Sequence, residues 1–116
     1  MRVRLLALAA VVAACGSDNG PTKPSTNKTV EVVTFESTFS SNFITINAGD
    51  TVRWTFSVAS DGFGHNVLFN PRPPGTPPDI AAEKKSGSDF RVFSTPGTFH
   101  YVCTLHGSMT GDVVVQ

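Results

Sequence analysis

The succession of short β-branched and aromatic runs from residue 30 onward constrains the fold more than any other feature of the chain. In "FITINAGDTVRWTFSV" (43–58), apolar residues alternate at Ile44 and Ile46 and again from Val52 to Val58, on either side of the turn signal "NAGD". Further short runs follow the same pattern: "VEVVTFE" (30–36), "HNVLFN" (65–70), "DFRVF" (89–93), "TFHYVC" (98–103) and "DVVVQ" (112–116). Many short strands with frequent turns predict an all-β antiparallel sandwich or small barrel of about seven strands.

One segment interrupts this pattern. "NPRPPGTPP" (70–78) contains too many prolines for an interior strand. "PDIAAEKK" (78–85) has the composition of a brief helix, the one helical segment that the sequence suggests. We therefore expect residues 70–88 to form a long surface excursion.

The first residues are typical of an export signal. The basic start "MRVR" precedes the uncharged run "LLALAAVVAA" (5–14), which is too short to span a bilayer and is followed by Cys15. "VAAC" also resembles the cleavage box of bacterial lipoproteins, in which the cysteine after the cut carries lipid. An ordinary signal cleaved at Ala13 or Ala14 is the alternative.

The lipoprotein interpretation divides the chain into three parts. Residues 1–14 would be the signal peptide, residues 15–29 the lipidated Cys15 and a flexible tether rich in Gly, Pro, Ser and Thr, and residues 30–116 the folded domain. The protein would then be exported and lipid-anchored to a bacterial membrane, on its periplasmic or cell-surface side. Nine Lys and Arg balance nine Asp and Glu without a basic run, so nucleic acid is not an expected partner.

The two cysteines raise the question of what protects a thiol in an oxidising compartment. A lipidated Cys15 cannot form a disulfide, which leaves Cys103 unpaired. A bound metal is the simplest protection, whereas a buried and inert cysteine that packs as a small hydrophobe is the competing interpretation.

The stretch "CTLHGSM" places Cys103, His106 and Met109 at intervals of three. Its glycines and the flanking apolar runs favour a loop over a helix, and such a loop can direct all three side chains to one point. His65, at the start of an upstream strand, is the obvious fourth ligand. Two imidazoles, one thiolate and a weak axial thioether suit a type 1 copper site that accepts both Cu(I) and Cu(II). Zinc prefers four strong Cys or His ligands, and iron–sulfur clusters need more cysteines.

Residues 42–115 resemble the cupredoxins, the type 1 blue copper proteins of the plastocyanin and amicyanin kind. The resemblance lies in "ITINAGDTVRW", "GHNVLF" and "TPGTFHYVCTLHGSMTGDVVV", whose short ligand loop is similar to that of amicyanins. It implies a Greek-key β-sandwich of about seven to eight strands. It also implies that His65, Cys103 and His106 are equatorial copper ligands, with both histidines binding through Nδ1, and that Met109 is the axial ligand.

The resemblance assigns further roles around the ligands. Asn66 would link the two ligand loops, with its backbone N–H donating to the cysteine sulfur. Leu105 stands where relatives often have proline, so we expect a less rigid loop. Val102 stands where plant plastocyanins carry a tyrosine, so electrons should pass mainly through the exposed edge of His106. His100 alternates with Phe99 and Tyr101 on its strand, so we expect it to face the side opposite to Cys103, toward solvent, and not to bind metal.

Together these features predict a monomeric, membrane-tethered carrier of single electrons, not an enzyme, whose protein redox partners dock on the apolar rim around His106. Copper capture or delivery with the same ligands is the alternative. A cysteine nucleophile assisted by His106 or His65 lacks an evident orienting group in the sequence. A multicopper oxidase fragment would place a histidine where Thr104 stands, and a metal-free immunoglobulin-like module leaves the ligand set unexplained.

Overall fold

The computed structural model describes residues 27–116, and the predicted signal peptide and Cys15 lie outside them. The described residues form nine strands and no helix: β1 (Thr29–Phe35), β2 (Thr38–Phe39), β3 (Phe43–Ile46), β4 (Asp50–Thr55), β5 (His65–Phe69), β6 (Ile80–Lys84), β7 (Ser88–Phe93), β8 (Gly97–Val102) and β9 (Thr110–Val115). β1 begins at Thr29, one residue before the predicted start of the domain. Within residues 27–116, no helix has the length and hydropathy needed to cross a membrane.

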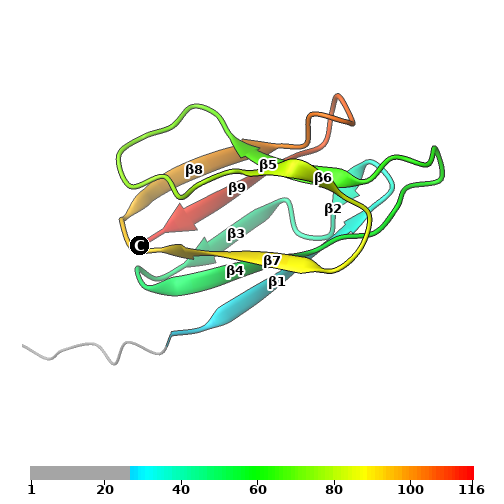
Figure 1. Ribbon diagram of the computed structural model, residues 1–116. Helices are drawn as coiled ribbons and strands as arrows, with labels where there is room; N and C mark the ends of the chain where they lie inside the picture. The colour runs from blue at the N-terminus through cyan, green and yellow to red at the C-terminus, as the bar shows by residue number, and fades with distance from the viewer. Residues whose placement is uncertain (1–26) are drawn as a thin grey trace, which may run out of the picture.

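The strands form two facing sheets (Figure 1), with the orders β2-β1-β4-β7 and β3-β9-β8-β5-β6. This arrangement confirms the predicted all-β sandwich. The predicted purely antiparallel pairing is wrong in two places, because β1 pairs with β4 and β3 with β9 in parallel. Consecutive strands β3 and β4 lie in different sheets, so the chain crosses between the sheets and brings strands of the same direction side by side.

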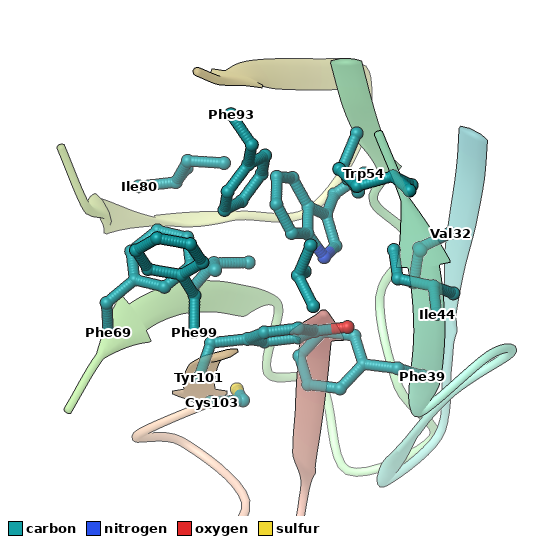
Figure 2. Packing of buried hydrophobic residues seen from close by; sticks show 14 of the residues in the cluster. Val32, Phe39, Ile44, Trp54, Phe69, Ile80, Phe93, Phe99, Tyr101 and Cys103 are labelled. Carbon is teal, nitrogen blue, oxygen red and sulfur yellow. The ribbon is translucent and has the colours of Figure 1, made fainter. Parts of the chain in front are cut away.

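The inward-facing side chains of both sheets form one aromatic-rich core. Trp54 of β4 packs edge-on against Tyr101 of β8, with ring centroids 5.5 Å apart. Figure 2 shows this pair at the centre of the core, and Cys103 beyond Tyr101 at its margin. The predicted alternation holds through Ile44, Ile46, Val52 and Trp54, all of which are buried. It continues to Phe56, which is buried just beyond the end of β4, and fails at Val58, which is exposed.

The predicted helix over 78–85 is wrong, and the surface excursion is shorter than expected. Residues Ile80–Lys84 form β6, which pairs antiparallel with β5 through Val67 opposite Ile80 and His65 opposite Lys84. β6 is the last strand of its sheet, and its side chains are mostly exposed except for the buried Ile80, so the segment is an exposed edge strand. Pairing with β5 outweighs the local helix propensity, and it supports the strand that carries His65.

Candidate metal centre

Two segments that lie far apart in the sequence meet at one end of the sandwich. His65 is the first residue of β5, and Cys103 directly follows β8. These strands are antiparallel neighbours, with Leu68 opposite Val102, and this register brings His65 close to Cys103 across 38 positions of sequence. His106 and Met109 follow in the β8–β9 loop, shown in orange in Figure 1.

The three predicted equatorial ligands form a compact donor set. Cys103 Sγ lies 3.7 Å from His106 Nδ1 and 4.0 Å from His65 Nδ1, and all three donor atoms lie within 4.8 Å of one another. Bond lengths of about 2.0 Å to nitrogen and about 2.3 Å to sulfur, at angles near 120°, would place N and S about 3.7 Å apart. The spacing therefore fits one first-row transition-metal ion held between a sulfur and two imidazoles.

The donor set is shielded from solvent. His65 is 0%, Cys103 3% and His106 7% exposed. Burial lowers the pKa of His65 below its usual value, with the neighbouring His106 adding to the effect, so its imidazole is neutral and free to donate to a metal near pH 7. A buried thiol that only packs in a core has no reason to be flanked by two Nδ1 atoms. We therefore favour the metal site over the inert cysteine.

Met109 is held beside this set by the backbone of the ligand loop. Its carbonyl accepts from the Cys103 N–H at 2.9 Å, and its own N–H donates to the His106 carbonyl at 3.0 Å. The residue is buried, as an axial ligand would be, although burial alone also suits a methionine that only packs in the core. The axial role of Met109 remains a prediction.

Replacing Met109 by leucine separates these two roles. Leucine preserves the apolar volume, so we expect the copper-loaded variant to stay folded and blue. Loss of the weak thioether donor should raise the reduction potential, because an apolar leucine beside the metal leaves the doubly charged Cu(II) less well compensated than Cu(I). Potentiometric titration of both proteins tests this expectation, and an unchanged potential would mean that Met109 only fills the core.

Asn66 joins β5 to the ligand loop, as the resemblance implies. Its side-chain oxygen accepts from the Thr104 N–H at 2.8 Å, and its amide nitrogen donates to Thr104 Oγ1 at 2.8 Å and to the Ala81 carbonyl at 3.2 Å. The buried amide thus binds the residue next to Cys103 twice and also holds β6. The bond from the Asn66 backbone to the sulfur remains a prediction.

Sequence reasoning missed one residue at this site. Asp61, in the β4–β5 loop, places Oδ2 3.2 Å from His106 Nε2. The His106 side chain is 6% exposed, so the freely exposed ring edge expected from the sequence is largely covered. Hydrogen bonds from the Phe63 backbone and from His106 hold the pKa of Asp61 below its usual value, so the carboxylate is charged at neutral pH. The only sequence signal is a "DG" turn shortly before His65.

The two other residues singled out near the ligands differ in their environment. His100 pairs with Asp112 at 2.8 Å on the outer face of the sheet and lies outside the donor set, as predicted. Leu105 is half-buried against the core beside His106, so only part of its side chain is available to a docking partner.

Comparison with known proteins agrees with this geometry. Residues 27–116 match the model of the copper-binding proteins of the plastocyanin/azurin family. Amicyanin-alpha of Methylorubrum extorquens is 37% identical over 75 residues, which cover 63% of this chain and 60% of that protein. Plastocyanin of Dryopteris crassirhizoma is 34% identical over 88 residues, covering 63% of this chain and 82% of that protein. The chain spans 60% and 54% of the length of the amicyanin-alpha and of the Tetradesmus obliquus plastocyanin.

Solved structures show the same relationship. Amicyanin from Paracoccus versutus superposes with a TM-score of 0.61 at 26% identity, covering 82% of this chain and 86% of that one. A mutant of amicyanin in its oxidised form gives a TM-score of 0.63 at 28% identity, covering 75% of this chain and 81% of that one. A copper-containing nitrite reductase from Thermus scotoductus shares the fold alone, at 19% identity. The chain belongs to the plastocyanin/azurin family of copper-binding proteins, the cupredoxins.

Proposed function

We propose that this protein is a membrane-tethered type 1 copper protein that carries single electrons between redox partners outside the cytoplasm. The observation that carries the proposal is the buried donor set, in which one sulfur lies 3.7 and 4.0 Å from two imidazole nitrogens. Copper bound there would take up and release one electron by cycling between Cu(I) and Cu(II). The chain belongs to the plastocyanin/azurin family of copper-binding proteins, which supports the assignment of copper to this site.

The residues around the site favour rapid electron transfer because they hold the ligands in place. Asn66 clamps Thr104, and the backbone bonds of Met109 to Cys103 and His106 close the ligand loop on itself. Ligands fixed in this way change position little when the charge of the metal changes, which keeps the energetic cost of each transfer low.

Location and partners are further parts of the proposal and derive from the sequence. A lipid on Cys15 and the tether up to residue 29 would hold the domain close to a bacterial membrane. Partner proteins would dock at the end of the sandwich that carries the ligand loop, where Phe63 is exposed and Leu105 half-buried near His106.

One contact in the structure bears on the alternative that Cys103 is an enzymatic nucleophile. Asp61, His106 and Cys103 form a carboxylate–imidazole–thiol series, so the orienting group that the sequence lacked is present. Cys103 is nevertheless only 3% exposed, and its sulfur is flanked by a second imidazole, His65. A substrate cannot reach such an atom without displacing the loop, so we retain the metal site and propose no enzymatic activity.

Addition of Cu(II) to the purified protein tests the proposed function. We expect an intense thiolate-to-copper charge-transfer band in the visible spectrum and narrow copper hyperfine splitting in EPR. The protein should then be reduced and reoxidised repeatedly by one electron without losing copper. A colourless protein that binds copper only weakly would refute the site.

The same sample distinguishes the carrier from a copper-delivery protein. A buried donor set should release copper slowly to a mild chelator, and self-exchange between oxidised and reduced protein should be fast. Rapid loss of copper to the chelator, together with slow self-exchange, would instead indicate delivery.

A further inference from the structure

The β4–β5 loop (residues 56–64) is built so that Asp61 faces His106. Asp61 Oδ1 accepts from the Phe63 N–H at 2.9 Å, which leaves Oδ2 free to reach His106 Nε2 at 3.2 Å. Ala59 closes the turn, since its N–H donates to the Phe63 carbonyl at 2.8 Å and its carbonyl accepts from Gly62 at 2.9 Å. Gly62 has a φ of 85°, a left-handed conformation that glycine adopts without strain.

A second anchor ties this loop to the neighbouring β1–β2 turn. Glu36 Oε2 accepts from the backbone N–H of Ser60 at 3.2 Å and from its hydroxyl at 2.7 Å. The carboxylate of Asp61 therefore sits in a loop bound on both sides and not on a free tip. In Figure 1 this loop (green) and the ligand loop (orange) extend from the same end of the sandwich.

The contact determines which nitrogen of His106 can bind metal. A neutral imidazole carries one N–H, and a charged carboxylate accepts it. With Nε2–H donated to Asp61, the lone pair lies on Nδ1, which is the atom that faces Cys103 Sγ at 3.7 Å. His65 differs, because its buried Nε2 has no hydrogen-bond partner among the residues that the structure describes.

We infer that Asp61 is a positioning residue for the copper ligand His106. It fixes the Nε2–H tautomer and the ring orientation, and its negative charge lowers the reduction potential by favouring Cu(II) over Cu(I). The inference rests on the proposed function. Because the Asp61 side chain is 49% exposed, water screens its charge and the effect on the potential is moderate.

The test replaces Asp61 by asparagine in the copper-loaded protein. Asp61→Asn keeps a side-chain oxygen for the Phe63 N–H, so the loop should hold its shape, while the charged acceptor of the His106 proton is removed. At constant pH we expect the equilibrium to shift toward Cu(I) by about tenfold, which corresponds to about 59 mV for one electron. Asp61→Glu restores the charge and should return part of the shift.

Asp112→Asn is the matched control. Asp112 also bonds a histidine, but that histidine is His100, outside the donor set. This variant removes one negative charge without touching a ligand, and we expect its potential to differ little from that of the original protein. An equal shift in both variants would show that only net charge matters and would overturn the positioning role.

A second readout does not depend on copper. In the metal-free protein, nitrogen NMR of the imidazoles should show His106 as the Nε2–H tautomer, and Asp61→Asn should reduce that population or speed exchange of the proton. If both the tautomer and the potential stay unchanged while the blue band persists, the inference fails and the electron carrier stands. If the original protein never turns blue, the proposed function fails, and the NMR comparison still decides whether Asp61 fixes the tautomer of His106.

Discussion

Replacing Cys103 by serine is expected to abolish the visible charge-transfer band and to weaken copper binding at least about 100-fold, since even outer-shell partners contribute 10–100-fold. The sulfur is the only soft anionic donor in the set, and a serine hydroxyl does not ionise near neutral pH. Serine has nearly the same shape, so the metal-free variant should keep the fold. Copper titrations followed by absorption and EPR measure the loss, and circular dichroism checks the fold.

His100→Gln is the control for this prediction. It removes a histidine of the strand that leads into Cys103, but one that pairs with Asp112 on the outer face and contributes no donor atom to the site. Its blue band and copper affinity should match those of the original protein. A Cys103→Ser variant that keeps the band, or a His100→Gln variant that loses it, would show that copper is bound elsewhere.

The strands that depend on local pattern could be predicted, and the edge strand could not. Alternating apolar residues in β3 and β4 mark their buried faces directly, from Ile44 to Trp54. β6 has only one deeply buried residue, Ile80, followed by Ala, Glu and Lys that favour helix in isolation. Its strand conformation comes from hydrogen bonding to β5, a non-local pairing that no window of sequence reports. The parallel pairs escaped prediction for the same reason.

The residues of the site also fall into those that the sequence indicates and those that only the fold brings together. Cys103, His106 and Met109 lie within one loop, so their spacing alone indicates a common target. His65 joins them only through the register of β5 with β8, which the family resemblance implies and periodicity does not. Asp61 reaches His106 through the conformation of the loop over 56–64, which depends on several hydrogen bonds formed only in the fold. Contacts of that kind become visible only in a structure.

Gly64→Ala is expected to destabilise the fold by about 3 kcal/mol and to weaken copper binding about tenfold or more. A Cβ at this position would lie 2.7 Å from the Lys84 carbonyl carbon and still closer to its oxygen. Both are backbone atoms of β6, so β5 and β6 would have to separate at the point where His65 begins β5. Chemical denaturation of the metal-free protein and copper titration measure the two effects.

Gly107→Ala tests whether the effect of Gly64→Ala comes from this collision and not from losing a glycine near a ligand. Gly107 directly follows His106, yet a Cβ there would meet no atom within 4 Å. Its substitution should therefore change the free energy of unfolding by less than about 1 kcal/mol and leave copper affinity intact. Because the two glycines each neighbour a ligand histidine, equal destabilisation of both variants would contradict the close β5–β6 approach as the cause. If only Gly64→Ala lowers both the free energy of unfolding and the copper affinity, the result would instead show that the spacing between β5 and β6 sets the position of His65. The metal site depends on that position.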